Sequence, residues 1–202
     1  MKTQNLIAAT IVSASLFTVS CTKDLVRLEG EGAITTTTLQ VDEFTGIDLE
    51  GVDNVYITYG AEQQVTVTGH PNIISRIRTD VFNNTWYIAL ENGNYGDYEL
   101  TYHLTLPRIE KVVSNGTGNV EITDFISQDE LSVRLVGTGN FLGFPLAVKN
   151  CSIDISGSGN CEVTVENRLD VNIDGSGRVY YQGSPIVHED ISGTGSVTHR
   201  NN

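Results

Sequence analysis

The sequence predicts an all-β protein: a parallel β-helix, or solenoid, of stacked rungs, preceded by an N-terminal region of β-strands. The first observation is a Gly-[Ser/Thr]-Gly unit that occurs five times, with first glycines 21, 20, 18 and 18 residues apart. The ten glycines are Gly116, Gly118, Gly137, Gly139, Gly157, Gly159, Gly175, Gly177, Gly193 and Gly195. The second is an apolar–polar alternation before the units, and the third is a polar residue followed by an apolar one after each unit. Self-similarity at such a period is typical of repeat architectures.

Each rung is expected to be a strand, a corner and a second strand. Alternating inward residues precede the corners, as in Leu131/Val133/Leu135, Cys151/Ile153/Ile155 and Leu169/Val171/Ile173. Period-two alternation buries one face, and a rung of this length cannot bury that face alone, so the rungs must stack. The glycines supply positive φ and allow close backbone approach at each corner. Asn119, Asn140 and Asn160 directly follow three corners and are expected to stack into a hydrogen-bonded ladder.

A Gly-x-Gly unit can also bind phosphate, but that use needs a helix after the glycines to aim its amides at the ligand. Here a strand pattern follows every copy, so we interpret the units as structural corners. The calcium-binding nonapeptide repeat needs Asp in a fixed position after the glycines, where this chain has Val120, Phe141 and Cys161. The repeat therefore predicts no metal site and no cofactor.

The repeat register predicts that Cys151 and Cys161 are buried free thiols. Cys151 takes the inward position of Leu131 and Leu169, and Cys161 takes that of Phe141 and Val179. Extended strands on either side of an open corner hold the two sulfurs on the order of 10–15 Å apart. A disulfide needs Cα atoms within about 7 Å, so we expect none.

Upstream of the repeats, residues 40–106 alternate without glycine corners and are expected to form the N-terminal strands of one domain that spans 40–200. The repeats occupy 107–200. Asn83-Asn84 is expected to form a two-residue hairpin turn. Residues 71–77 can form a turn or two of helix, with Asn72 as a possible cap.

The first residues are expected to be a leader, outside the fold, followed by a tether that becomes the first strand. Residues 6–19 carry no charge and have the proportions of a secretory signal segment, and they are too short and too rich in Ser and Thr to span a bilayer. Ser20-Cys21 resembles a bacterial lipobox, although Thr18 stands where that pattern usually has Leu. We therefore predict a lipoprotein signal peptide over 1–20, lipidation of Cys21, and a tether over 21–39.

The charge balance limits the partners. The formal net charge is −13, and loss of residues 1–20 removes Lys2 and no acid, which gives −13 − 1 = −14 for the mature chain. Such a surface repels phosphate backbones and anionic headgroups, so nucleic acid and charge-driven membrane binding are disfavoured.

The chain resembles a known family, the head GIN domain of autotransporter-type adhesins. The resemblance is carried by Phe44, Ile47, Gly51, Val55, Ile57 and Gly60, then by Leu106-Pro107 entering the Gly-[Ser/Thr]-Gly-Asn-Val rungs. It covers roughly residues 30–197. The family implies β-helix-like stacked sheets in an exported protein. Its motifs are structural, so they indicate the fold and not the ligand.

No catalytic residue is predicted. Glycoside chemistry on a β-helix needs paired or clustered carboxylates, whereas the acids of the repeats are expected to be scattered over different rungs and faces. These acids are Asp129, Glu130, Asp154, Glu162, Glu166, Asp170 and Asp190. Arg134 and Asp154 share a position on adjacent rungs and are expected to form an exposed ion pair. His188 and Asp190 lie on one strand face, but no metal-ligand spacing supports a site there.

Glu189 stands where other rungs have Val or Ile, which indicates a final capping rung with an open inner face.

The best binding candidate in the sequence is the loop 92–98, in which Tyr95, Asp97 and Tyr98 offer stacking area and hydrogen bonds. The alternative is a polar hairpin tip whose tyrosines fold back over the sheet. We interpret the protein as an outer-membrane lipoprotein that acts as a binding or adhesion module for a glycan or an envelope protein. The alternatives are an envelope scaffold without a ligand and a carbohydrate-active enzyme. Free sheet edges would also allow homo-oligomers to form.

Overall fold

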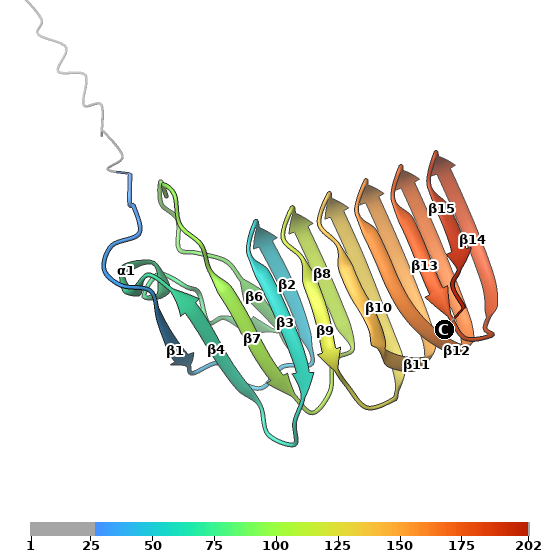
Figure 1. Ribbon diagram of the computed structural model, residues 1–202, viewed down its shortest axis with the longest axis horizontal. Helices are drawn as coiled ribbons and strands as arrows, with labels where there is room; N and C mark the ends of the chain where they lie inside the picture. Colours follow the sequence, from blue (N-terminus) through green and yellow to red (C-terminus); the bar gives the residue numbers. More distant parts are fainter. Residues whose placement is uncertain (1–26, 202) are drawn as a thin grey trace, which may run out of the picture.

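The computed structural model describes residues 27–201 and confirms the predicted all-β solenoid. The rungs stack along the long axis of the molecule, with the corners along one edge (Figure 1). The expected signal peptide and Cys21 lie outside the described residues. No helix within residues 27–201 is long and apolar enough to span a bilayer.

Each rung contributes a strand to each of two facing sheets. The sheet that leads into the corners contains β2 (Gly46–Gly51), β8 (Lys111–Gly116), β10 (Gln128–Gly137) and β14 (Ile186–Gly193), together with the second halves of β11 (Phe141–Gly157) and β12 (Asn160–Gly175). We call it the pre-corner sheet. The post-corner sheet contains β3 (Asn54–Tyr59), β9 (Val120–Asp124), β13 (Arg178–Gln182) and β15 (Ser196–His199), together with the first halves of β11 and β12. These strands pair in parallel within each sheet.

The glycine corners stack in the predicted register. Gly116, Gly137, Gly157, Gly175 and Gly193 follow one another in the pre-corner sheet, and each has a positive φ. The Gly157 carbonyl accepts the backbone N–H groups of Ser176 (2.8 Å) and Gly177 (3.1 Å) from the next corner. A Cβ at Gly157 would overlap the Gly137 carbonyl oxygen, so the close stacking as well as the positive φ requires glycine.

A further corner, which the repeat did not reveal, begins the row. Gly51 has a φ of 105° and pairs with Gly116, and its carbonyl accepts the N–H groups of Thr117 (2.9 Å) and Gly118 (3.1 Å). The chain here reads Gly51-Val52-Asp53, so the third position carries a side chain. The corner could not be recognised from the glycine pattern for that reason.

The asparagine ladder forms as predicted and extends one rung further. Asn119, Asn140 and Asn160 each donate a side-chain N–H to the Oδ1 of the preceding asparagine, at 3.1, 2.8 and 3.0 Å. The first acceptor is Asn54, which follows the corner at Gly51. Each Oδ1 also accepts the backbone N–H of the next asparagine, so the ladder joins four rungs.

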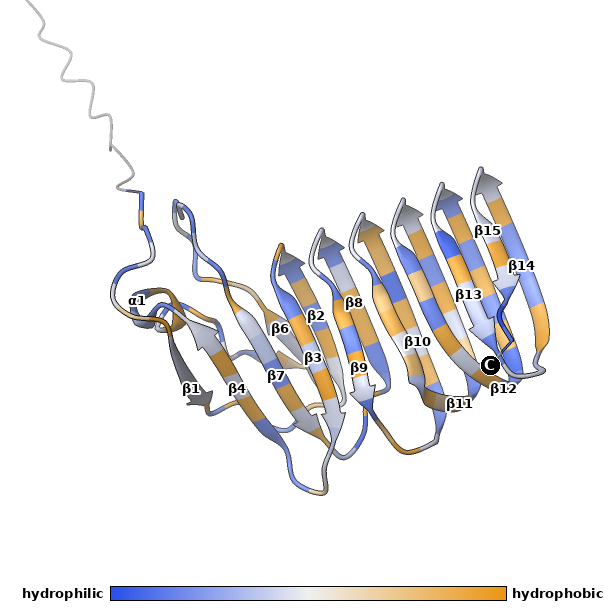
Figure 2. Ribbon diagram, viewed as in Figure 1, coloured by the Kyte–Doolittle hydropathy of each residue, from blue (hydrophilic) through white to orange (hydrophobic). Residues whose placement is uncertain are grey.

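The core lies between the two sheets, and the strands alternate in hydropathy along their length (Figure 2). Cys151 pairs with Leu131 and Leu169, and Cys161 pairs with Phe141 and Val179, as the register predicts. Both are buried free cysteines, which confirms the prediction. Burial raises the pKa of the Cys151 thiol to about 12 and raises that of Cys161 well above its usual value.

The N-terminal region continues the post-corner sheet and closes one end of the core. β7 (Thr101–Leu106) pairs in parallel with β3, and β4 (Gln64–Gly69) and β1 (Thr35–Leu39) add antiparallel strands beyond it. β5 (Val81–Phe82) and β6 (Thr85–Ile88) form the predicted hairpin, with positive φ at Asn83 and Asn84, and β6 pairs with β2.

The short helix is present as α1 (Pro71–Ile74), but the prediction that Asn72 caps it is wrong. The N-cap position is His70, and Asn72 lies inside the helix. Its side chain binds the N-terminal segment instead: Nδ2 donates to the Glu29 carbonyl at 2.7 Å, and Oδ1 accepts the Glu31 N–H at 2.9 Å. Proline at the first helical position starts the helix without a side-chain cap, which leaves Asn72 free for this contact.

Candidate functional site

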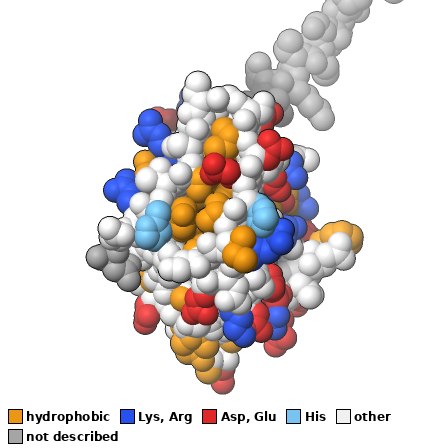
Figure 3. Space-filling model, turned by 90° about the vertical axis from the view of Figure 1, so that its right-hand side faces the viewer, with side chains coloured by type: hydrophobic (Ala, Val, Ile, Leu, Met, Phe, Trp, Pro, Cys, Tyr) orange, Lys and Arg blue, Asp and Glu red, His pale blue; other side chains and the backbone are white. Residues whose placement is uncertain are grey.

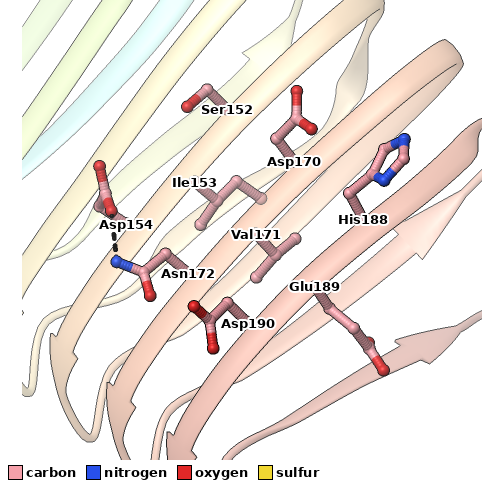
Figure 4. Close-up of a pocket in the computed structure, with 9 residues that line it drawn as sticks. All are labelled: Ser152, Ile153, Asp154, Asp170, Val171, Asn172, His188, Glu189 and Asp190. Carbon is pink, nitrogen blue, oxygen red and sulfur yellow. Dashed lines mark hydrogen bonds between the residues drawn. The ribbon is translucent and has the colours of Figure 1, made fainter.

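A shallow hollow of about 240 Å³ lies on the outer face of β11, β12 and β14, toward the C-terminal end of the solenoid (Figure 4). Its lining consists of Ser152, Ile153, Asp154, Asp170, Val171, Asn172, His188, Glu189 and Asp190. Pockets that enclose a small ligand usually hold about 300–1,000 Å³, so a ligand here would be held on a surface and not enclosed.

The repeat register arranges the outward side chains of the hollow in two rows. Ser152, Asp170 and His188 are aligned on the three strands, and Asp154, Asn172 and Asp190 form a parallel row two residues nearer the corner. Neighbouring strands lie about 4.8 Å apart, so each row repeats a polar group at that distance. Carboxylates, a hydroxyl, an amide and an imidazole therefore converge on one face.

This arrangement corrects part of the expectation for the acids of the repeats: they come from different rungs, as expected, but three of them share one face. Asp154, Asp170 and Asp190 lie on adjacent strands and on the same face. The signal was present in the sequence: Asp154, Asn172 and Asp190 each stand three residues before a corner glycine. Because the corners stack, residues at the same sequence distance from their own corner glycine lie side by side.

Two hydrogen bonds from Arg168 fix the carboxylate of Asp170. Arg168 donates to Asp170 from Nε (2.6 Å) and Nη2 (2.7 Å). These hydrogen bonds, aided by the charges of Arg168 and His188, lower the pKa of Asp170 against the opposing effect of its partial burial. Asp170 is therefore held as an anion and a hydrogen-bond acceptor.

The predicted ion pair of Arg134 with Asp154 is wrong. The two residues are cross-strand neighbours, but the described side chains form no salt bridge between them. Asp154 instead accepts a hydrogen bond from Asn172 Nδ2 at 3.1 Å. Asn172 lies on the other neighbouring strand at the same spacing, and its short amide reaches the carboxylate without ordering a long side chain.

His188 and Asp190 share the outer face of β14, as the sequence indicated. Within residues 27–201, no group of three or more His, Cys, Asp or Glu side chains is arranged to hold a metal ion.

The loop 92–98 lies at the opposite end, where the N-terminal segment covers it. Leu28 forms a parallel β-bridge with Tyr95. The Leu28 N–H donates to the Asn94 carbonyl, and the Gly96 N–H donates to the Leu28 carbonyl, both at 2.8 Å. Tyr95 and Tyr98 are partly buried against the core, with ring centroids 6.0 Å apart. The Tyr95 hydroxyl donates to the Glu91 carbonyl at 2.8 Å. The tyrosines thus fold back over the sheet, which is the alternative considered for them.

Asp97 is the most exposed of the three predicted binding residues. Its carboxylate lies 3.4 Å from Arg27 Nη2, and its N–H donates to Glu29 Oε2 at 2.8 Å. A ligand-binding role for Tyr95, Asp97 and Tyr98 stays a prediction, since their contacts attach the N-terminal segment to the solenoid.

A buried carboxyl that the sequence did not reveal lies at the first corner. Asp53 is 7% exposed and accepts a hydrogen bond from the Leu100 N–H. Burial raises its pKa to about 7, in spite of that hydrogen bond. Nearby, the Tyr102 hydroxyl is buried without a hydrogen-bond partner among the described atoms. Its pKa is raised, mainly by burial and to a smaller extent by the charge of Asp53.

Comparison with known proteins agrees with this fold. Residues 43–143 and 130–185 match the model of the family described as "Putative auto-transporter adhesin, head GIN domain". The matched segments cover more than half of the chain, so the protein belongs to this family, as the resemblance in the sequence indicated.

Two solved structures with a similar architecture illustrate the likeness. A crystal structure titled putative adhesin from Bacteroides fragilis is 19% identical, covers 86% of this chain and 100% of its own, and has a TM-score of 0.56. One titled putative lipid binding protein from Parabacteroides distasonis is 18% identical, covers 87% and 100%, and has a TM-score of 0.51. At these identities the likeness shows the fold alone. Among curated proteins, no relative matches the sequence.

Proposed function

We propose that the protein is an exported, non-catalytic binding module of the cell envelope, and that it recognises an uncharged glycan at the hollow on β11, β12 and β14. The observation that carries this proposal is the pair of aligned rows of hydrogen-bonding side chains (Figure 4). Sugar hydroxyls both donate and accept hydrogen bonds, and the rows offer carboxylate and amide acceptors beside amide and imidazole donors.

The negative charge of the hollow favours neutral glycans over acidic ones. The hollow contains Asp154, Asp170 and Asp190, and the whole chain carries a formal charge of −13. Uronate or sulfated sugars would be repelled by this surface, because like charges brought together on binding are unfavourable. Neutral sugars meet no such cost.

The state of Asp170 supports binding over hydrolysis. A glycosidase needs one carboxylic acid that keeps its proton near neutral pH while a second carboxylate stays ionised. The bidentate contact with Arg168 lowers the pKa of Asp170, which opposes the first role.

The shape of the molecule suits presentation of this surface away from a membrane. β1 and α1 lie at one end of the solenoid, and β12 to β15 lie at the other (Figure 1). Cys21 precedes the first described residue, Arg27, by six residues, a span of at most about 20 Å. A lipid on Cys21 would therefore hold the β1 end near the bilayer and leave the hollow near the far end.

A glycan array with the purified protein tests the binding proposal. We expect neutral glycans to bind, and Asp190→Ala to weaken that binding at least about tenfold, the loss of one or two charge-assisted hydrogen bonds. Glu162→Ala on the opposite sheet removes an equal charge and serves as the matched control, with no expected change. Binding that survives Asp190→Ala and is lost in Asp97→Ala would place the ligand on the loop 92–98 instead. An array without signal would favour the scaffold alternative.

Metabolic labelling tests the anchor separately. If Cys21 is lipidated, the protein incorporates labelled palmitate and partitions into the detergent phase, and Cys21→Ser abolishes both. Unchanged partitioning of the variant would contradict a lipid anchor at this residue.

A further inference from the structure

The C-terminal end of the solenoid leaves its last rung uncovered. Within residues 27–201, β14 pairs only with β12, and β15 pairs only with β13, so each strand has one free edge. In the view onto this end, hydrophobic side chains gather in the middle of the face, with an acidic group among them and polar and charged groups around them (Figure 3). A free edge presents unpaired backbone N–H and carbonyl groups that can pair with another chain.

The inner residues of the last rung continue the core without a next layer. Val187, Glu189 and Ile191 are in register with Leu169, Val171 and Ile173 of β12. The β12 residues are 0–4% exposed, whereas Val187 and Ile191 are only partly buried and Glu189 is exposed. Glu189 thus places a carboxylate in an otherwise apolar row, and its side chain points away from His188 and Asp190 (Figure 4).

We propose that this end binds an extended segment of another protein, which adds as a strand along β14. The segment has a lysine or arginine at the position facing Glu189 and apolar residues two positions to either side, facing Val187 and Ile191. Strand addition of this kind gains affinity from backbone hydrogen bonds and specificity from alternate side chains. Opposite charges at facing positions stabilise a strand pair.

Charge complementarity favours this occupant over a second copy of the chain. An antiparallel pair of two β14 strands that brings Val187 opposite Ile191 necessarily brings Glu189 opposite its own counterpart. Like charges directly opposite one another destabilise a strand pair, and each copy carries a net charge of −13. An inward-pointing charge at an edge is also a known protection against self-association. A basic partner strand converts the same carboxylate into an attractive contact.

Synthetic peptides test the proposal on the whole chain. The probe is an acetylated, amidated peptide of alternating Thr and Val with one central Lys in place of Val, and the comparison peptide has Glu at that position. In NMR titrations we expect the Lys peptide to bind at least about tenfold more tightly than the Glu peptide. N-methylation of the backbone amides along one edge of the Lys peptide should abolish binding, because it removes the donors that pair with β14.

A charge swap separates the inner face from general electrostatics. Glu189→Lys should reverse the preference, so that the Glu peptide binds more tightly. Asp190→Lys makes the same charge change on the outer face of the same strand and should keep the preference for Lys. Both residues are exposed, so thermal melts should show that both variants fold.

Three results would overturn the proposal: equal effects of the two variants, no chemical-shift change at millimolar peptide, or an N-methylated peptide that binds as well as its parent. A concentration-dependent dimer of the wild-type protein that Glu189→Lys disrupts would assign the same face to a second copy of the chain.

Discussion

The two ends of the solenoid are finished in different ways. At the N-terminal end, α1, β1 and the β5–β6 hairpin extend and close the stack, and the large rings of Phe44, Trp86 and Tyr102 are at most 4% exposed. At the C-terminal end, Val187, Ile191 and Val197 are only partly buried, and no element covers them among residues 27–201. The rung sequence can therefore propagate the stack but cannot terminate it. Termination needs non-repeating sequence, which within residues 27–201 closes the N-terminal end of the stack and not the C-terminal end.

Closure also changes the polar groups that the core can hold. The closed end buries a carboxyl, Asp53, whose pKa is raised to about 7. The open end places Glu189 in the inner row of β14 but leaves it in contact with solvent.

The loss of stability caused by replacing a corner glycine should depend strongly on the position of that glycine in the stack. Gly157→Ala places a Cβ on the Gly137 carbonyl and keeps a strained φ of 138°, so we expect a loss of at least about 4 kcal/mol in the free energy of unfolding. Gly51 begins the row, has a φ of 105°, and has no atom within 4 Å of the added Cβ. Gly51→Ala should therefore cost only the strain of positive φ, about 1–2 kcal/mol. Equal losses in urea denaturation would contradict corner packing as the source of the difference.

The pH dependence of stability should report Asp53. The unfolded chain releases this proton near pH 4, whereas the folded protein keeps it up to about pH 7. The folded state thus binds more protons in between, and the contribution of Asp53 to stability falls by on the order of 3 kcal/mol as the pH rises from 4 to 7.

Asp53→Asn removes this titration, and its amide oxygen can still accept the Leu100 N–H. We expect the stability of the variant relative to wild type to increase over the same pH range, measured by denaturant titration at pH 4, 5.5, 7 and 8. A difference that stays constant with pH would mean that Asp53 ionises normally in the folded protein.

Replacing an asparagine in the interior of the ladder should reduce stability more than replacing the one at its C-terminal end. Asn140→Ala leaves the Asn160 backbone and side-chain N–H groups without their acceptor, and it also removes a donor to Asn119. We expect a cost of about 2 kcal/mol. Asn160→Ala removes only the side-chain donor to Asn140, because its backbone N–H can still reach the Asn140 Oδ1, and should cost about 1 kcal/mol. The reverse order in thermal melts would show that the ladder does not act through Oδ1 as the acceptor.

The open end should become more stable and more prone to self-association when its inner row is made apolar. Glu189→Val restores the residue type of Val171 and should raise the stability of the last rung by about 1 kcal/mol. It should also allow end-to-end association, detectable by light scattering at increasing concentration. His188→Val on the outer face of the same strand is the control and should stay monomeric. A monomeric Glu189→Val variant would show that this carboxylate does not protect the edge.

The sequence alone determined the repeating half of the molecule. The distance of a residue from its corner glycine fixes whether its side chain points inward and which residues lie beside it on neighbouring rungs. That rule was sufficient for the stacked corners, for the asparagine ladder and for the buried thiols of Cys151 and Cys161. Applied to the outward positions, it also contains the two polar rows of the hollow.

Only the tertiary structure decided the parts that lack this periodicity. The first corner carries Asp53 in place of the second glycine, and whether that carboxyl is buried depends on the distant Leu100 and Tyr102. Loop 92–98 is bound by Leu28, more than sixty residues away, through backbone hydrogen bonds that any sequence can make. The choice of Asn172 over Arg134 by Asp154 is likewise a competition between two equally spaced neighbours. Periodicity encodes the direction of a side chain, whereas closure of an end depends on contacts between segments with no common period, and selection among equally spaced partners depends on the length and chemistry of their side chains.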